Sequence, residues 1–495
     1  MKIKKNKKDI ITFIIIFSIT LIIFIPFLQK HYATDSYNIS SLGYKEYAIN
    51  NSLNDGRVLM AFIGFTADLL KIPLDIYIIT LTILALFVSC ISVIVLKEYI
   101  LEIKKNENLF SEIFVIIVSY FTIFNFMFIE NMVFVECFVM ALSILAYILA
   151  AKIIISKNKN YLAKATVLTI LGVFCYQGTI SMYLASLLLF SLLKNEKYDE
   201  CIKNLAKGVL ILLFGIILQF IEIKLCGIIF NMHQERVSRF FYVIINIIYS
   251  IYYLGDIIIN TGYVYTKYLY LFFLLIIEFL IVFKSYKEKL NNNIVIHTFL
   301  IILFCLFAGI AVSFISMTGF WSARIRFSIG ATIGFLIIYL YCKTDIVFTY
   351  KKINVLIVSI YIIYTLSIVT NYISIMNNTL NVNLQDKIQA IKLNNYIEKY
   401  EEENNIIVNK LAIFPGKFNA EKAYYSNLKY YGSAMSWSAI RTKWSIKGII
   451  EMYSNRHFIM TEPNETELEY YVKNVDKEIE YMCIGDTLYI GYYVG

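Results

Sequence analysis

Long apolar runs, separated by short polar stretches, fill most of the first 375 residues. A run of this kind that is long enough to cross a hydrocarbon layer of roughly 30 Å predicts a transmembrane helix. About eleven such runs occur, at 10–28, 75–96, 109–128, 132–151, 162–176, 179–193, 206–223, 266–283, 294–316, 328–342 and 353–372. The pattern predicts an all-α polytopic membrane protein with about eleven transmembrane helices in residues 1–375.

Two further apolar segments, Arg57 to Ile72 and Phe240 to Asn260, are short or interrupted by polar residues. If neither of them crosses, lysine clusters fall consistently on one side of the membrane, as the positive-inside rule requires. We therefore expect interfacial helices near 57–72 and 240–260 on the outer side. The alternative, that one of them is a true span and the topology differs, stays open.

The N-terminus is basic from Lys2 to Lys8, which places it in the cytoplasm. The first apolar run is long and no small-residue cleavage site follows it, so we read it as an uncleaved span. An odd number of spans then places the C-terminal region outside the cell membrane. These features predict a multi-pass protein of the cytoplasmic membrane with an extracytoplasmic C-terminus.

The chain becomes more polar after residue 375. Residues 376–405 resemble a helix, Ile406 to Phe414 reads as a strand, and Leu488 to Tyr493 reads as a closing strand after the Gly485-Asp486 turn. We expect residues 376–495 to form a small extracytoplasmic α+β domain.

Composition supports lipid as the main solvent of the chain. Hydrophobic residues make up 59% and charged residues only 16%, whereas soluble domains contain roughly 25% charged residues. So few charges cannot cover a core of this size in water, which excludes an ordinary water-soluble enzyme. The 8 cysteines form no Cys-x-x-Cys pair, and 4 histidines are too few for a histidine-built metal site.

The polar residues of the first two outer loops are the first candidates for chemistry, because ionisable groups near a membrane are costly. Asp35 follows the first span closely, so its carboxylate can act as a general base toward a hydroxyl or hold a divalent metal. It can equally be a loop residue that caps a helix. Arg57 suits phosphate but can also be an interfacial anchor. Glu130 and Asn131 lie beside the next span, where a glutamate at a helix start is also favoured by the dipole.

The later outer loops add an amide, an aromatic ring and arginines. Tyr176 and Gln177 form the tip of a tight hairpin, where they can bind sugar hydroxyls or satisfy the turn. The last candidates are four arginines in the expected outer loops, where the positive-inside rule predicts few basic residues. They are Arg236, Arg239, Arg324 and Arg326. A lipid-linked phosphate would explain them, and contact with ordinary anionic lipid is the alternative.

The ordered set of motifs in the first 200 or so residues is similar to that of a known family. These motifs are Asp35-Ser36-Tyr37, Leu42-Gly43-Tyr44, Asp55-Gly56-Arg57-Val58-Leu59, Phe128-Ile129-Glu130-Asn131, Met140-Ala141-Leu142-Ser143 and Tyr176-Gln177. They resemble those of the bacterial serotype-converting glucosyltransferases of Gtr type II. The later spans and the C-terminal region match that family only in outline.

The resemblance implies a GT-C-like fold. It also implies inverting transfer of a hexose, glucose in this family, from a polyprenyl-phosphate carrier to a cell-surface glycan on the outer face. Carried across, Asp35 is the catalytic carboxylate, Arg57 and Glu130 belong to the site, and Tyr176 and Gln177 lie near it. Ser36 stands where the family often has a second Asp, which puts a two-carboxylate metal site in doubt and favours a metal-free general base.

The expected partners are a polyprenyl-phosphate-linked sugar, a surface glycan acceptor and membrane lipid, with no nucleic acid. No cofactor is required by the sequence, although a divalent metal stays possible. Two other functions use the same residues: a glycan polymerase or ligase, and a flippase for lipid-linked sugars. A flippase would need a polar path through the spans, where the sequence has almost no charge.

Overall fold

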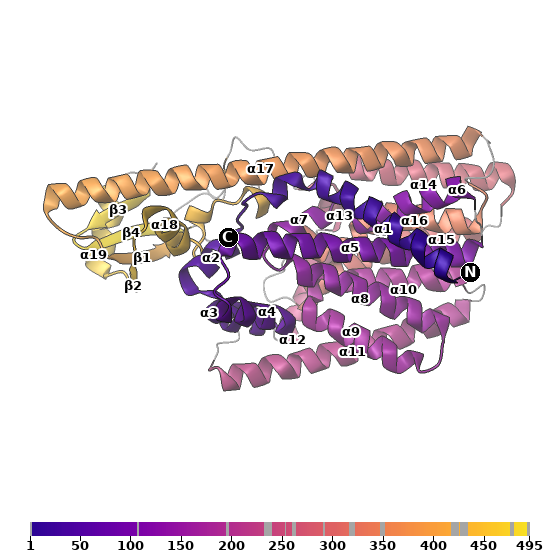
Figure 1. Ribbon diagram of the computed structural model, residues 1–495, viewed down its shortest axis with the longest axis horizontal. Helices are drawn as coiled ribbons and strands as arrows, with labels where there is room; N and C mark the ends of the chain where they lie inside the picture. The colour runs from indigo at the N-terminus through magenta and orange to yellow at the C-terminus, as the bar shows by residue number, and fades with distance from the viewer. Residues whose placement is uncertain are drawn as a thin grey trace.

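Apolar helices run back and forth between two ends of the molecule, and a small α+β unit sits beyond one end (Figure 1). This computed structural model describes residues 2–105, 108–194, 198–231, 240–252, 254–259, 264–290, 293–315, 322–346, 352–416, 425, 434–475 and 480–492. The helical, membrane-type class expected from the sequence is confirmed. A C-terminal α+β unit is also present.

Seven helices within the described ranges are long and apolar enough to span a bilayer. They are α5 (Leu74–Lys104), α8 (Cys137–Ser156), α10 (Ile180–Lys194, preceded by the 3-10 turn η3, Gln177–Thr179), α11 (Tyr198–Ile229), α14 (Leu269–Glu288), α15 (Asn293–Ala311, followed by η5, Val312–Ile315) and α17 (Lys352–Asn404). The four other expected spans coincide with shorter or more charged helices: α1 (Lys2–Ile23), α6 (Leu109–Ile123), α9 (Tyr161–Cys175) and α16 (Phe327–Lys343). The total of eleven crossings, and their direction, remain predictions.

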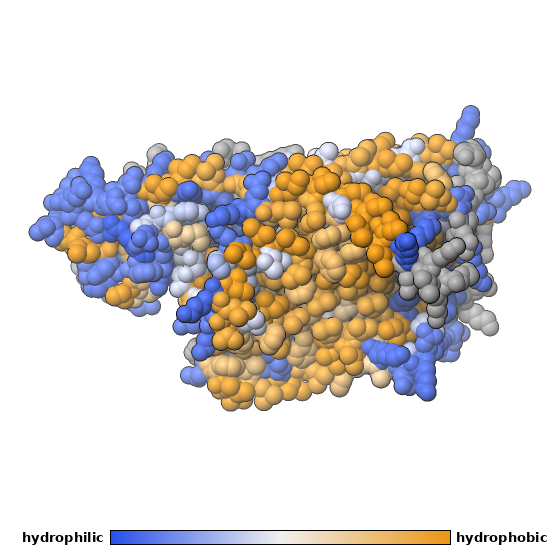
Figure 2. Space-filling model, in the orientation of Figure 1, coloured by the Kyte–Doolittle hydropathy of each residue, from blue (hydrophilic) through white to orange (hydrophobic). Residues whose placement is uncertain are grey.

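The helices differ in how much of their surface meets lipid. Every residue of α16 from Phe327 to Tyr341 is buried, as expected for a helix that is apolar on all sides. The outer helices instead expose large apolar side chains, such as Leu210 at 65% and Phe279 at 65%. Figure 2 shows the resulting apolar surface over the bundle, with hydrophilic residues gathered at its two ends. A surface of this kind is stable in a hydrocarbon environment.

A group of short helices caps the bundle at the end that carries the α+β unit. They are α2 (Thr34–Leu42), α3 (Tyr44–Tyr47), the π-helical turn η2 (Ala48–Leu53), α4 (Val58–Leu69) and α7 (Phe128–Val133). The expected segment 57–72 is therefore helical, and so are the described parts of 240–260, as α12 (Phe240–Tyr252) and α13 (Leu254–Ile259). The first residues of the apolar run that begins at 132 belong to the separate short helix α7. Helix α8 therefore begins at Cys137, five residues later than expected.

The α+β unit contains a sheet with the strand order β2-β1-β4-β3. The elements are β1 (Lys410–Pro415), α18 (Ile446–Ser454), β2 (Ile459–Thr461), α19 (Glu465–Asn474), β3 (Tyr481–Ile484) and β4 (Thr487–Tyr492). Strand β1 is parallel to β2 and β4, and β3 pairs antiparallel with β4. The strand expected from Ile406 begins only at Lys410, because its neighbours β2 and β4 reach no further.

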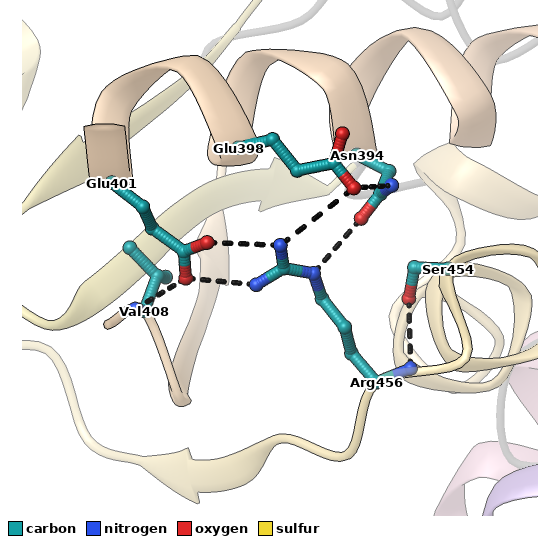
Figure 3. Close-up of polar contacts among 6 residues, drawn as sticks. All are labelled: Asn394, Glu398, Glu401, Val408, Ser454 and Arg456. Atoms are coloured by element: carbon teal, nitrogen blue, oxygen red, sulfur yellow. Dashed lines mark hydrogen bonds and ion pairs between the residues drawn. The ribbon is translucent and has the colours of Figure 1, made fainter. Parts of the chain in front are cut away.

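Helix α17 continues without a break across residue 375, so it belongs both to the bundle and to the α+β unit. Its far end is fastened by Arg456, which forms two hydrogen bonds of 2.8 and 2.9 Å with the carboxylate of Glu401 (Figure 3). The same guanidinium donates from Nε to Asn394 at 2.9 Å, and Glu401 also accepts from the backbone of Val408. A bidentate arginine–carboxylate pair of this type fixes orientation as well as distance.

The α+β unit also contacts the short helices directly. Helix α18 packs on α2, and Tyr37 of α2 is buried in the same apolar cluster as Ile449 of α18. A Cβ placed on Gly448 would lie 1.7 Å from the carbonyl oxygen of Tyr37. Only glycine permits this approach, so the α+β unit rests on the helix that carries Asp35.

Candidate functional site

The candidate residues of the expected outer loops converge at the end of the bundle next to the α+β unit. Three of the elements that carry them are far apart in the chain, and α7 and η3 both contact η6 (Ala323–Ile325). Asp35 lies in the first turn of α2, and Arg57 precedes the first residue of α4. The site is therefore assembled from turns and helix ends.

Arg57 is held between two carboxylates. Its Nη1 lies 2.5 Å from Oε2 of Glu136, and its Nη2 lies 3.1 Å from Oδ2 of Asp55. Burial alone would lower the pKa of Arg57. Glu136 and Asp55 together raise this pKa by more than burial lowers it, so the net shift is upward. The guanidinium is therefore permanently charged and its donors are directed by the carboxylates.

The turn that presents Arg57 depends on glycine and on two glutamines. Gly56 has φ +70°, a conformation that other residues adopt only with strain. Nε2 of Gln219 donates to the Gly56 carbonyl at 3.1 Å, and Nε2 of Gln177 donates to the Asp55 carbonyl at 3.2 Å. Gln177 is thus connected to the loop of Arg57.

Tyr176 interacts with two arginines. The guanidinium carbon of Arg57 is 5.0 Å from the centre of the Tyr176 ring, which is cation–π distance. Arg324 interacts electrostatically with the same tyrosine. The ring occupies the space beside Gly178, where a Cβ would come within 2.4 Å of a ring atom. Burial raises the pKa of Tyr176, and the two arginines oppose that shift.

Glu130 binds the turn of the later arginines. Its Oε2 accepts the backbone N–H of Arg324 at 2.7 Å. Burial raises the pKa of Glu130, and the charges of Arg324 and Arg326 oppose the rise. The Arg324 guanidinium lies 3.9 Å above the ring of Phe134. A buried carboxylate and two arginines are therefore adjacent at this turn.

Asp35 is half-buried and interacts electrostatically with members of this cluster. It lies within electrostatic range of Arg324 and of Tyr47. The residue at the N-cap is Ala33, whose N–H is accepted by Ser36, so Asp35 is not the capping residue. Its carboxylate is instead in the first helical turn, where the helix dipole favours a negative charge.

The segment before Asp35 is fixed by α17. The Tyr32 N–H donates to Oδ1 of Asn383 at 2.8 Å, and Nδ2 of Asn383 donates back to the Tyr32 carbonyl at 2.8 Å. The Tyr32 hydroxyl donates to Asp75 of α5. Two long helices thus determine where α2 begins.

Several buried polar atoms at the site have no hydrogen-bond partner among the described residues. They are Oε1 of Glu136, Oε1 of Gln177 and both amide atoms of Asn131. Asn131 is only 1% exposed and neighbours Glu130. Buried polar groups are normally paired, so these atoms are able to accept a polar partner such as water or a ligand.

Most of the site residues predicted from the sequence lie in one cluster. The structure brings together Asp35, Arg57, Glu130, Tyr176, Gln177, Arg324 and Arg326. Arg236 and Arg239 lie outside the described residues. Asn131 is on the same short helix as Glu130.

Three further residues belong to this cluster: Asp55 and Glu136, which pair with Arg57, and Tyr47, which lies near Asp35. The sequence could have pointed to Asp55 and Glu136, since both are acidic and lie beside helix starts in the expected outer loops. Nothing in the sequence distinguished Tyr47 from the other tyrosines, of which the chain has 40 in all.

The charges of the cluster nearly cancel, with the guanidiniums of Arg57, Arg324 and Arg326 facing the carboxylates of Asp35, Asp55, Glu130 and Glu136. In the described part of the chain, no group of three or more His, Cys, Asp or Glu side chains is placed to hold a metal ion. The observed arrangement offers arginines for an anion and one half-buried carboxylate for a proton.

Comparisons with known proteins identify no relative: no family model, no curated protein and no solved structure matches this chain. The function must therefore be argued from the site.

Proposed function

We propose that the protein is a membrane glycosyltransferase that moves a hexose from a polyprenyl-phosphate carrier to a cell-surface glycan at the outer face. The observation that carries the proposal is the position of Asp35, half-buried within electrostatic range of Arg324 at one end of an apolar bundle. A base for the acceptor and cations for a lipid phosphate then lie side by side. The resemblance to Gtr type II enzymes favours glucose as the sugar.

In this mechanism Asp35 accepts the proton of the acceptor hydroxyl. The hydroxyl oxygen forms a bond to the anomeric carbon, and the bond from that carbon to the phosphate oxygen breaks with inversion. The polyprenyl phosphate leaves with the electron pair of that bond and gains one negative charge. Protonation of Asp35 removes one negative charge from the cluster at the same moment, so Arg324 and Arg326 are better able to stabilise the phosphate.

The remaining residues position these groups. Arg57 is already engaged by two carboxylates, so we assign it to holding Glu136 and Tyr176 in place. The unpaired atoms of Gln177, Asn131 and Glu136 provide acceptors and donors for sugar hydroxyls. Discrimination between sugars would then rest on these three side chains.

A flippase is less consistent with the distribution of buried charge. Among the described residues, ion pairs such as Lys97–Asp9 and Lys284–Glu288 lie at the end of the bundle near the N-terminus. In the middle of α14, Glu278 is hydrogen-bonded to Thr298 of α15. Glu222 of α11 likewise accepts a hydrogen bond from Cys226, one turn further along the same helix. Two separate, bonded carboxylates do not form a polar path.

The test is the substitution Asp35→Asn in cells that carry the gene. We expect the modified surface glycan to disappear and the polyprenyl-phosphate sugar to accumulate, with unchanged protein abundance in the membrane. Asp68→Asn is the matched control, because Asp68 is an exposed carboxylate of the same outer region, on α4. Normal glycan in the Asp35→Asn strain would refute the proposal.

Analysis of the accumulated lipid by mass spectrometry completes the test. A single hexose on the polyprenyl phosphate supports the proposed transfer. An oligosaccharide would instead identify a polymerase or ligase and contradict the monosaccharide donor.

A further inference from the structure

Two of the 3 tryptophans in the chain, Trp437 and Trp444, lie together on the α+β unit. Their ring centres are 5.9 Å apart and the ring planes are inclined by 81°, so the edge of one ring meets the face of the other. Trp437 is half-buried, whereas Trp444 is 44% exposed. An edge-to-face pair is a favourable aromatic contact, so Trp437 holds the exposed ring of Trp444 in position.

Each tryptophan is followed by a buried serine that is fastened to α17. Ser438 donates to Oδ1 of Asp386 at 3.2 Å, and the backbone N–H of Ala439 donates to the same carboxylate at 3.1 Å. Ser445 donates to the carbonyl of Ala439 at 2.6 Å. The backbone beside both tryptophans is therefore held at the level of Asp386 on α17.

This level is far from the expected hydrocarbon layer. Asp386 lies about four turns, roughly 20 Å along the unbroken helix α17, beyond residue 372, where the apolar run ends. The headgroup layer is only about 5–8 Å thick on each side of a bilayer. Tryptophans that anchor a protein to lipid lie within that layer, so this pair faces water instead.

The segment that carries the pair begins beside the candidate site. The 3-10 turn η8 (Ala434–Ser436), directly before Trp437, contacts α7, the short helix of Glu130 and Asn131. Met435 of this turn is 1% exposed and is buried in the apolar cluster of the bundle. A polymer bound at the site is thus able to reach the tryptophans, whereas a single hexose is too small to occupy both places.

Hydrogen-bond donors lie close to the tryptophans in the chain. Lys443 is exposed, precedes Trp444, and has its Nζ 5.7 Å from the centre of the Tyr492 ring. Arg441 is paired with Glu480. A sugar ring carries C–H groups on its faces and hydroxyls around its edge, so it matches an exposed aromatic face with cationic donors near it.

We propose that Trp437 and Trp444 form a binding site for the surface glycan that accepts the hexose. Trp444 stacks on a sugar ring of the glycan, and Trp437 positions Trp444. This site binds a part of the polymer away from the hydroxyl that reacts at Asp35. The inference rests on the proposed function for the identity of the glycan as the acceptor.

Isothermal titration calorimetry of the purified full-length protein tests the site directly. The probe is unmodified surface polysaccharide from a strain that lacks the gene, released from its lipid. We expect Trp444→Ala to weaken binding about tenfold, and Trp444→Phe, which keeps an aromatic ring, to weaken it less than about threefold. Trp444→Gln repeats the test with a polar side chain if the alanine variant does not fold.

Tyr470→Ala is the matched control, because Tyr470 is a 52% exposed aromatic residue on α19 of the same unit. Equal weakening in Tyr470→Ala and Trp444→Ala would overturn the inference, and so would a wild-type protein that does not bind the polysaccharide. A Trp444→Ala variant that binds polysaccharide normally but changes its oligomeric state would also overturn it, since the pair would then contact protein.

The two proposals fail in different ways. If Asp35→Asn leaves the glycan unchanged while Trp444→Ala still binds polysaccharide more weakly, the glycosyltransferase proposal is wrong and the glycan site stands. If Asp35→Asn abolishes modification while Trp444→Ala binds normally, the assignment of the tryptophans alone is wrong.

Discussion

Burial of Arg57 with two carboxylates is costly unless all three charges are present. Its side chain is 14% exposed, and those of Asp55 and Glu136 are 4% exposed. We expect Arg57→Ala to lower the free energy of unfolding by about 3–5 kcal/mol, because two carboxylates are then left without their cation. Thermal unfolding of the detergent-purified protein measures this loss.

A double variant distinguishes the effect of losing the whole ion pair from the effect of losing the arginine alone. Arg57→Met combined with Glu136→Gln removes one charge from each side, so part of the lost stability should return. Arg456→Ala is the comparison outside the site, since it breaks the more exposed pair between Arg456 and Glu401 of α17 (Figure 3). A double variant no more stable than Arg57→Ala would contradict this account.

Asp386 is a second buried carboxylate, located on the part of α17 that carries the α+β unit. Burial raises its pKa to about 7, although Tyr425 and the backbone of Ala439 donate hydrogen bonds to it. The folded state then binds more protons than the unfolded state between about pH 4 and 7. Stability contributed by this group is present below that window and is lost as pH rises through it.

The substitution Asp386→Asn should therefore flatten the dependence of stability on pH across this range. The measurement is the midpoint of thermal unfolding of the α+β unit in the full-length protein at several pH values. Asp486→Asn is the control, because its carboxylate is exposed and Lys410 lowers its pKa. An unchanged slope in Asp386→Asn would show that this carboxylate titrates normally.

The packing of α18 on α2 can be tested by a substitution at Gly448. Gly448→Ala would place a methyl group 1.7 Å from the Tyr37 carbonyl oxygen, so the two helices must separate. Because α2 carries Asp35, we expect glycan modification to fall by more than about tenfold. The α+β unit should also become more sensitive to protease.

Gly255→Ala is the matched control for that substitution. Gly255 lies in helix α13, and a Cβ there would meet nothing within 4 Å. Normal activity and normal protease resistance in Gly448→Ala would show that α2 does not depend on the α+β unit.

The sequence predicted the long helices well because each of them is encoded by its own apolar run. All eleven expected runs coincide with helices, although α8 begins later than its run does. The short helices at the end of the bundle were harder to predict, since α3 and η2 are four and six residues long. Such elements depend on tertiary contacts, for example the hydrogen bond from Tyr44 to the Ile72 carbonyl.

The site was predictable only at the level of residue type and of the loops that carry these residues. Acidic, basic and aromatic residues in the outer loops marked Asp35, Glu130 and Arg324 as candidates. The pairing of Arg57 with Glu136 spans 79 positions in the chain and depends on how the turn before α4 meets the start of α8. Pairings of this kind require the packed structure, because no local pattern encodes them.

At the scale of the whole molecule, the proposed chemistry requires the site and the α+β unit to lie outside the cell. Hydrophilic residues gather at the end of the bundle opposite the α+β unit (Figure 2), and the sequence places lysine-rich turns on that side. Lys159 lies in one of these turns and Lys473 lies in the α+β unit, and both side chains are exposed. Single cysteines at these two positions can therefore report the orientation.

We expect a membrane-impermeant maleimide to label Lys473→Cys in intact cells and Lys159→Cys only after permeabilisation. Native cysteines contribute little background, because of the 8 only Cys226 and Cys342 are even partly exposed, and both can be replaced by serine. Labelling of both variants in intact cells would contradict the expected topology. Labelling of Lys159→Cys alone would place Asp35 and its arginines in the cytoplasm, where a surface glycan cannot be the acceptor, and the proposed transfer would fail with it.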